Sequence, residues 1–400
     1  MRILVLAQRV PYPPNRGDKI PAYHYIRHLA QHHEVNVACL ADGPDDLVNV
    51  KGLEPLVKSV DAVPLSRTGR RVRALAALLG RRPLTVAYFD EPELRRQVRA
   101  RVAREAIDLA IVFGSGMTSY VEEFADLPRI VQFVDLDSLK WQDYAAATYP
   151  PQRWVYATEA RRLLGYERHL AATFAHSLVC STRELEAFRR LIPDAPVRCI
   201  RNGVDLDYFR PRHVVKTANA LVFTGVMNYL PNVDGVDWFC REILPLIQQQ
   251  VPNTTFTICG SAPSPKVKAL AKLPGVSVTG AVPDVRTYLA RSSVGVVPLR
   301  IARGIQNKLL EAMAMGLPAV ATTSAWRGIE AKDGRDLLVA DEPAAFAAAV
   351  VQLLQDQRLR QTMGQAARET METHYRWEHT LAQLDEVCAL ATASSACPCS

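Results

Sequence analysis

The chain has 400 residues, of which 48% are hydrophobic and 22% are charged, and its formal net charge is +7 at pH 7. This composition is typical of a folded globular protein and excludes collagen-like, disordered and disulfide-scaffold classes. Because the chain is too long for one ordinary core, we expect two domains of about 200 residues each. No aromatic-interleaved basic strand or recognition-helix pattern accompanies the charge, so we expect no nucleic-acid partner.

From the N-terminal residues we expect a cytoplasmic protein. The first apolar run, MRILVLA, meets Gln8 and Arg9 long before the length that a signal peptide or a membrane span requires. Without an export signal, the cysteines are expected to be reduced thiols. Cys397 and Cys399 lie close together in the C-terminal tail, but a structural zinc would need four ligands.

Short β-branched runs alternate with helical patterns in the first half of the chain. The expected strands are RILVLA, EVNVACLA, SVDAVPL, DLAIVF, RIVQFVD and HSLVCS. Helices are expected from Tyr23 to Gln31 and, as one long stretch, from Lys140 to Thr173. The alternation of strand and helix predicts a parallel sheet with crossover helices.

Arginines bracket the apolar residues Leu75, Leu78 and Leu79 in the segment from Arg67 to Arg82. One interpretation of this basic amphipathic segment is peripheral docking on the anionic inner face of the cytoplasmic membrane. The other is an ordinary helix with a solvated face.

The strand and helix pattern restarts near residue 220. The expected strands are ALVFT, TTFTICG, VSVTG, SVGVVPL, PAVATT and DLLVA, and the expected helices run from about Pro231 to Gln250, from Pro265, from Asp284 and from Gln306 to Met315. Three helical patterns close the chain. The boundary between the two lobes is expected in the Gly- and Pro-containing stretch NGVDLDYFRPR.

We therefore expect an α/β protein with two Rossmann-like domains. Residues 1–205 form the first, residues 206–375 form the second, and residues 376–400 form a C-terminal helix that packs back on the first domain and a flexible tail. Ligands of open parallel sheets bind at the carboxyl ends of the strands, which predicts a site in a cleft between the domains.

The segment from Pro298 to Glu330 predicts a diphosphate site. A strand runs into a loop with Arg300, Arg303 and Gly304, and a helix carrying Lys308 and Glu311 follows. The free N–H groups and positive dipole end of that helix, together with Lys308, suit a diphosphate. Glu311, on about the same helix face, suits ribose hydroxyls. The alternative is an exposed helix pair worth only about 0.3 kcal/mol.

Within this segment, LLEAMAMGLPAVAT resembles the core signature of family-4 glycosyltransferases, which have the GT-B fold of two Rossmann-like domains facing each other across a cleft. Asn-Gly-Val-Asp at 202–205, Phe-Thr-Gly at 223–225 and the strand-end Gly260 match further family motifs. A closer likeness is to the sugar transferases associated with exosortase/PEP-CTERM exopolysaccharide clusters. It is carried by PYPPNRGDKIPAYHYIRHL, VDLDSLKWQDYA, FTGVMNYLPNVDGVDWF and RIARGIQNKLLEAMAMG.

The resemblance implies a retaining hexosyltransferase that moves a sugar from a nucleotide-sugar donor to a lipid-linked saccharide acceptor in exopolysaccharide or envelope glycan synthesis. It implies three groups of site residues. The donor-binding residues are Gly17, Gly225, Asn228, Gly260, Arg300, Gly304, Ile305, Gln306, Lys308 and Glu311. The acceptor-binding residues are Arg16, Asp18, Lys19, Asp135, Asp137 and Lys140, and the catalytic residues are Lys308, Arg303 and Asp137.

Two departures from the family pattern bear on these roles. Arg303 stands where many members have the first glutamate of a Glu-x7-Glu pair that ends at Glu311. The stretch from Val226 to Tyr229 lacks the Arg and Lys that many members place after the strand-end glycine. We expect Lys308, with Arg303 or Arg300, to supply the positive charge that the missing Arg and Lys would give to the pyrophosphate. Otherwise the chain would be a catalytically inactive GT-B partner subunit, or a nucleotide-sugar epimerase or a phosphorylase on the same scaffold.

Several residues have a simpler interpretation beside the functional one. The loop around Gly17 could be a turn with Asp18 capping the next helix. Asp135 and Asp137 mimic the Asp-x-Asp metal motif of another transferase fold, but the cationic phosphate site makes a metal unnecessary, so we expect no metal and no cofactor. The histidines of the segment from His24 to His33 are expected to be ordinary side chains.

Overall fold

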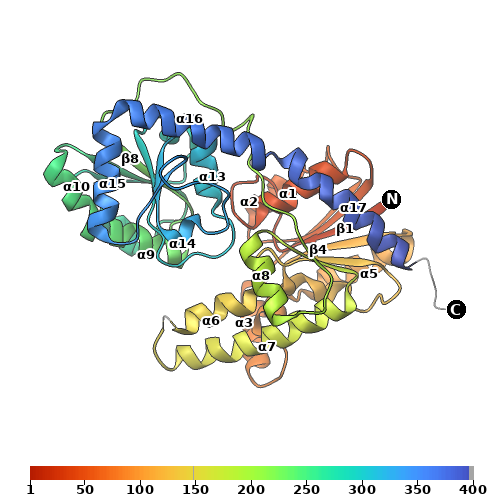
Figure 1. Ribbon diagram of the computed structural model, residues 1–400. Helices are drawn as coiled ribbons and strands as arrows, with labels where there is room; N and C mark the ends of the chain where they lie inside the picture. The colour runs from red at the N-terminus through yellow and green to blue at the C-terminus, as the bar shows by residue number, and fades with distance from the viewer. Residues whose placement is uncertain (147, 396–400) are drawn as a thin grey trace. The chain divides into compact units, whose positions relative to one another are not determined.

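The structure is a computed structural model that describes residues 1–146 and 148–395. Its contacts divide the chain into two compact units (Figure 1). The first unit contains Met1–Arg201 and the described residues from Leu381 onward, and the second contains Asn202–Thr380. None of the helices built from these residues combines the length and apolar character that a membrane crossing requires.

Seven parallel strands form the sheet of the first unit, in the order β3-β2-β1-β4-β5-β6-β7. Their bounds are Arg2–Ala7 (β1), Glu34–Ala41 (β2), Ser59–Pro64 (β3), Leu109–Phe113 (β4), Arg129–Gln132 (β5), His176–Val179 (β6) and Val197–Cys199 (β7). Every residue of β4 is buried, because helices cover both faces of a parallel sheet. The strand order reverses beside β1, which is the doubly wound arrangement.

The helices of the first unit differ at one place from those expected from the sequence. Their bounds are Lys19–Leu29 (α1), Pro44–Asn49 (α2), Val50–Gly52 (η1), Arg67–Leu78 (α3), Leu84–Phe89 (α4), Pro92–Arg104 (α5), Ser115–Tyr120 (η2), Asp137–Ala146 (α6), Gln152–Thr173 (α7) and Thr182–Leu191 (α8). The single helix expected from Lys140 to Thr173 is wrong, since α6 and α7 are separate. Pro150 and Pro151 lie between them, and proline has no N–H for a helical hydrogen bond.

Six parallel strands form the sheet of the second unit, in the order β10-β9-β8-β11-β12-β13. Their bounds are Ala220–Thr224 (β8), Thr255–Cys259 (β9), Val276–Gly280 (β10), Val294–Val297 (β11), Ala319–Ala321 (β12) and Leu338–Val339 (β13). This order repeats the reversal of the first sheet, here beside β8. The carboxyl ends of β8, β9 and β11 therefore meet at one edge.

The helices of the second unit are Leu230–Trp238 (α9), the π-helical turn Phe239–Ile243 (η3), Leu244–Gln250 (α10), Pro265–Leu270 (α11), Arg286–Arg291 (α12), Asn307–Ala314 (α13), Thr323–Trp326 (α14), Pro343–Gln355 (α15) and Gln357–His374 (α16). The helix expected from Pro231 to Gln250 is interrupted by η3, because Pro245 cannot donate a backbone hydrogen bond. The last helix, Trp377–Ser395 (α17), begins in the second unit. From Leu381 onward it belongs to the first unit, where Asp385 contacts His28 at 3.0 Å.

Candidate functional site

Lys308, in the first turn of α13, reaches over the end of β8. Its Nζ donates to Asn232 Oδ1 at 3.0 Å and lies 5.3 Å from the centre of the Phe223 ring. Asn232 Nδ2 in turn donates to the carbonyl of Val226 at 2.9 Å. The amino group is therefore held at the carboxyl ends of the strands, which is where parallel sheets bind ligands.

Burial shifts the pKa of both charged residues of α13 toward neutrality. It lowers the pKa of the Lys308 amino group to about 8, against the attraction of Glu311. It raises the pKa of the Glu311 carboxyl to about 7, against the attraction of Lys308. The exposed helix pair considered above is wrong, since both side chains are partly buried. Such shifted neighbours at strand ends are typical of functional sites.

Two glycines allow the ends of β8 and β9 to approach each other. A Cβ atom at Gly260 would lie 1.7 Å from the carbonyl oxygen of Gly225. A Cβ atom at Gly225 would lie 2.8 Å from Asn232 Nδ2 and 3.4 Å from Lys308 Cε. Any side chain at either position would collide with the backbone or with the groups around Lys308. Asn228 follows in the same turn and is exposed.

The loop before α13 leaves polar groups directed to the start of that helix. Gly304 has a φ of +62°, and Gln306 Nε2 donates to the carbonyl of Arg303 at 2.9 Å. Ile305 is buried, and the first N–H groups of a helix have no partner within it. Asn307 Oδ1 is buried and has no hydrogen-bond partner in the described part of the chain. A ligand at this helix start would meet donors from the backbone and an acceptor from Asn307.

Asn232 and Asn307 belong to the candidate site, but they were not predicted from the sequence. Each lies in the first turn of a helix that follows the carboxyl end of a strand, α9 after β8 and α13 after β11. That position was the signal available in the sequence, because asparagine in a first turn can offer both a donor and an acceptor.

Arg300 is engaged by a carboxylate on a neighbouring helix. Its guanidinium donates to both oxygens of Asp234, at 2.5 and 3.0 Å, and lies 5.5 Å from the Trp238 ring centre. Arg303 is half-buried in the loop before α13. Of the two arginines expected to replace the missing cations, Arg300 is therefore already paired with a carboxylate, Asp234 of α9.

Asp137 and Lys140 form an ion pair at the start of α6 in the first unit. The Lys140 Nζ donates to Asp137 Oδ1 at 2.6 Å, and the Ser115 hydroxyl donates to Asp137 Oδ2 at 2.9 Å. Although burial opposes it, the Asp137 carboxylate raises the pKa of Lys140 above its usual range. Asp135 lies nearby, its Oδ1 3.9 Å from Cys180 Sγ. The two aspartates are therefore held at the carboxyl end of β5.

No three His, Cys, Asp or Glu side chains within the described ranges group as a metal site would require. Both oxygens of Asp137 already accept from protein groups, as described above. Among the histidines, His24 is buried and His28 contacts Asp385. Cys397 and Cys399 lie outside the described residues.

The charged residues at and just before the start of α1 form ion pairs. Lys19 is buried and its Nζ lies 2.7 Å from Asp46 Oδ1. Asp18 pairs with Arg9, and Arg16 Nε lies 3.5 Å from Asp18 Oδ1. Asp18 makes no side-chain capping bond to α1, so the simple helix cap considered above is wrong. Gly17 is exposed in this loop.

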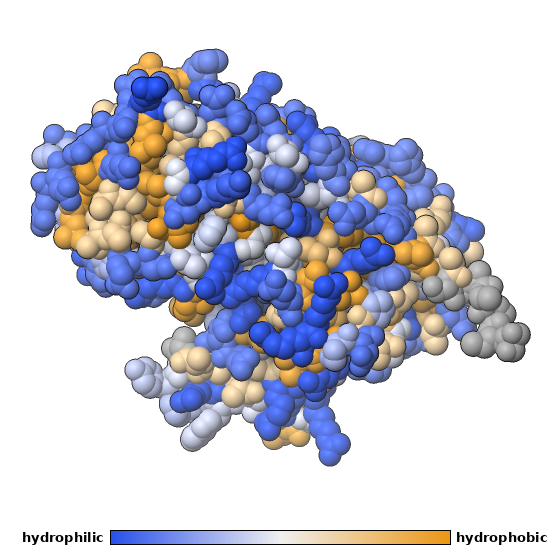
Figure 2. Space-filling model, viewed as in Figure 1, coloured by the Kyte–Doolittle hydropathy of each residue, from blue (hydrophilic) through white to orange (hydrophobic). Residues whose placement is uncertain are grey.

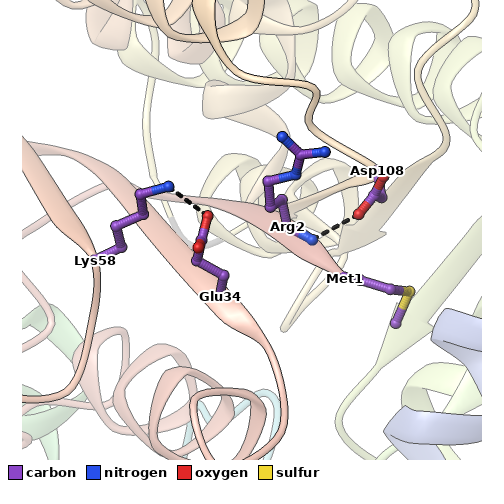
Figure 3. Close-up of a pocket in the computed structure, with 5 residues that line it drawn as sticks. All are labelled: Met1, Arg2, Glu34, Lys58 and Asp108. Carbon is purple, nitrogen blue, oxygen red and sulfur yellow. Dashed lines mark hydrogen bonds and ion pairs between the residues drawn. The ribbon is translucent and has the colours of Figure 1, made fainter.

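A separate pocket of about 440 Å³ lies at the opposite edge of the first sheet (Figure 3). Its lining includes Arg2, Glu34, Lys58 and Asp108, which lie at the amino ends of β1, β2, β3 and β4. Lys58 Nζ donates to Glu34 Oε1 at 2.5 Å, and the backbone N–H of Arg2 donates to Asp108 at 2.7 Å. Ligands of such sheets bind at the carboxyl ends, so this pocket is not the candidate site.

The buried Glu167 of α7 is hydrogen-bonded to the first turn of α6, next to Asp137. Its carboxyl group accepts from the backbone N–H of Ser138 at 3.0 Å and from the hydroxyl of the same residue. Burial raises the pKa of Glu167 to about 8 despite these hydrogen bonds. The pKa of a glutamate in the unfolded chain is about 4.3. The contribution of the protonated Glu167 carboxyl to the stability of the fold is therefore complete below that pH and is lost as pH rises to about 8.

We expect Glu167→Gln to stabilise the protein relative to wild type at pH 9 more than at pH 4, because the amide carries no charge to bury. Urea denaturation of both proteins at the two pH values measures this difference. Glu186→Gln, an exposed change on α8, should show no such pH dependence. Equal effects of the two substitutions would contradict the raised pKa.

The comparisons with known proteins agree with this architecture. Residues 218–356 match the family model described as glycosyl transferases group 1. Sucrose-phosphate synthase from Thermosynechococcus elongatus is 16% identical with a TM-score of 0.76, covering 98% of this chain and 100% of its own. A search of the curated proteins found no match to this sequence.

Two further solved structures have the same fold. Anabaena HepE in complex with UDP-glucose is 14% identical with a TM-score of 0.67, covering 97% of this chain and 99% of its own. WaaG, a glycosyltransferase involved in lipopolysaccharide biosynthesis, is 14% identical with a TM-score of 0.64 and the same coverage. The chain therefore has the GT-B fold. Lys308, Glu311 and both strand-end glycines lie within residues 218–356, the stretch that matches the group 1 family model.

Proposed function

We propose that the protein is a retaining glycosyltransferase of family 4 that transfers a hexosyl group from a nucleotide sugar to a saccharide acceptor. The observation that carries the proposal is the buried Lys308 amino group, held by Asn232 over the end of β8 within the stretch that matches the group 1 family model. A buried cation with a lowered pKa costs folding free energy. An anionic ligand beside the amino group would stabilise this charge and offset that cost.

The donor diphosphate would bind at the start of α13, where the helix dipole, the free N–H groups and Lys308 favour negative charge. Glu311, which has no hydrogen-bond partner in the part of the chain described, would accept from the ribose hydroxyls. During transfer, the bond between the anomeric carbon and the diphosphate oxygen breaks, a bond from the acceptor hydroxyl oxygen to the anomeric carbon forms, and the hydroxyl proton passes to the departing diphosphate. Lys308 and the helix dipole would then stabilise the departing diphosphate without a metal ion, and Arg303 would add a second cation.

The acceptor is proposed to meet the first unit through Asp135, Asp137 and the loop before α1. A lipid-linked saccharide of an exopolysaccharide or envelope glycan fits the resemblance to exosortase-associated transferases. It also fits peripheral contact with the inner face of the cytoplasmic membrane, because Val72, Leu75 and Leu79 of the basic segment are 60%, 63% and 96% exposed. Exposed apolar side chains beside arginines are typical of helices that lie on membranes.

Binding of a panel of nucleotide sugars, measured as the shift in melting temperature with and without EDTA, tests the donor site. We expect one nucleotide class to raise Tm of the wild type, with no effect of EDTA, and to leave Lys308→Ala and Glu311→Ala unshifted. No shift with any donor would favour the inactive partner subunit. Turnover of the donor without an acceptor would favour the epimerase, and sensitivity to EDTA would favour a metal at Asp135 and Asp137.

Donor affinity should depend on pH with a maximum between about pH 7 and about pH 8, the two shifted pKa values of the free protein. Below this window the Glu311 carboxylate gains a proton and accepts hydrogen bonds from the ribose hydroxyls less well, so the dissociation constant rises. Above it Lys308 loses the proton that the diphosphate requires, so the dissociation constant rises. Isothermal titration from pH 6 to pH 9 measures this profile, and an affinity independent of pH would rule out both residues as donor contacts.

A further inference from the structure

The first unit contains a second cavity, whose lining includes none of the predicted donor-binding or acceptor-binding residues. It has a volume of about 850 Å³ and is lined by segments of the α3–α4 connection, α5, η2 and α7. Its basic lining residues are Arg81, Arg82, Arg95, Arg99, Arg162 and His169. The size is within the usual range for pockets that bind small molecules.

Positive charge exceeds negative charge in this cavity. Five arginines line it, against two carboxylates, Asp90 and Glu122, and a third carboxylate, Glu123, accepts from Arg99 Nε at 2.8 and 3.0 Å. Arg82 and Arg95 share Asp90, each at 2.7 Å, so this one carboxylate serves two guanidinium groups. Glu122 accepts from the Tyr166 hydroxyl at 2.6 Å. The excess charge favours an anionic ligand.

Two of the arginines have no carboxylate partner. Arg162 uses its guanidinium to donate to the backbone carbonyls of Ala77 and Leu78, at 2.9 and 3.2 Å. Arg81 is exposed and makes neither an ion pair nor a hydrogen bond with a described residue. Guanidinium groups of this kind bind phosphate oxygens in pairs of parallel hydrogen bonds.

The contact of Arg162 also places the cavity beside the end of α3, where apolar side chains are exposed. Leu78 is 41% exposed and Leu79 is 96% exposed. Hydrophobic and strongly hydrophilic residues lie next to one another over the part of the first unit that contains α3 and α7 (Figures 1 and 2). An arginine-lined cavity with an apolar rim matches the two parts of a phospholipid, its phosphate and its acyl chains.

We propose that this cavity binds the phosphate of an anionic phospholipid head group while Leu75, Leu78 and Leu79 enter the edge of the bilayer. The proposal rests on the membrane contact proposed above but not on the sugar-transfer reaction. It assigns a defined phosphate site to α5, η2 and α7, none of which carries a predicted donor or acceptor residue. Lipid phosphate and soluble phosphate share the same chemistry, and the apolar rim favours the lipid.

Cosedimentation of the full chain with vesicles tests the site. The vesicles contain either phosphatidylcholine alone or phosphatidylcholine with phosphatidylglycerol. We expect Arg99→Gln to weaken binding to the anionic vesicles about tenfold, the usual effect of losing a hydrogen bond to a charged group. Arg96→Gln is the matched control, because Arg96 also lies on α5 and pairs with a glutamate but does not line the cavity.

Arg162→Gln and Arg161→Gln form a second matched pair on α7, since only Arg162 lines the cavity. Glycerol 3-phosphate, added as a soluble competitor, distinguishes the two sources of phosphate. Equal losses in the cavity variants and their controls would overturn the proposal in favour of general charge attraction. It would also be overturned if the wild type bound no vesicles, or bound glycerol 3-phosphate but not anionic vesicles. Retention of donor-induced Tm shifts in all four variants would show that the donor site is intact.

Discussion

Replacing Lys308 with alanine should lower kcat/KM for the proposed sugar transfer about 100- to 1000-fold, the usual effect of removing one group that stabilises developing negative charge. The amino group is held 3.0 Å from Asn232 Oδ1 over the end of β8, so its removal takes a positive charge away from the proposed diphosphate position. Steady-state kinetics with the donor found in the binding panel would measure the loss.

The same substitution should change Tm by less than about 4 °C, roughly 1–2 kcal/mol for a unit of this size. A buried lysine with a lowered pKa stabilises the fold little, because its desolvation opposes its contacts. Lys268→Ala is the control, since Lys268 is an exposed lysine of the same unit on α11. Loss of activity only in proportion to loss of folded protein would contradict a catalytic role for Lys308.

Gly260→Ala should lower the free energy of unfolding of the second unit by more than about 4 kcal/mol. Single substitutions cause losses of this size only when they create severe packing conflicts or comparable defects. The new Cβ atom would lie 1.7 Å from the carbonyl oxygen of Gly225, and backbone cannot move aside as a flexible side chain can. Hydrogen–deuterium exchange in peptides covering residues 220–260 would report the loss of β8 and β9. Donor binding should disappear with it.

Gly280→Ala provides the comparison at the end of the neighbouring strand β10. Gly280 has a φ of +72° but no heavy atom within 4 Å of its ideal Cβ position. Its substitution should therefore cost only the strain of the left-handed conformation, about 1–2 kcal/mol. If Gly260→Ala proved as mild as Gly280→Ala, the ends of β8 and β9 would be farther apart in solution than in this structure.

Local sequence patterns predicted the sheets well. ALVFT and VSVTG coincide with β8 and β10. Strands of a buried parallel sheet have short runs of apolar and β-branched residues, which can be recognised in the sequence between turns. The helices were less well predicted where proline interrupts a long polar or apolar pattern, as between α6 and α7 and at α10. A missing N–H changes the local hydrogen bonding without changing the periodicity of the pattern.

The sequence by itself determined which loops follow the strands, and with them the positions of Gly225, Gly260 and Lys308. Only the tertiary structure decided which partners these loops meet. Asn232 lies 76 residues from Lys308 in the chain, and Arg300 pairs with Asp234 over 66 residues. Local periodicity reports which face of an element is buried. A hydrogen bond across a sheet edge depends on strand order, and strand order is set by packing of the whole unit.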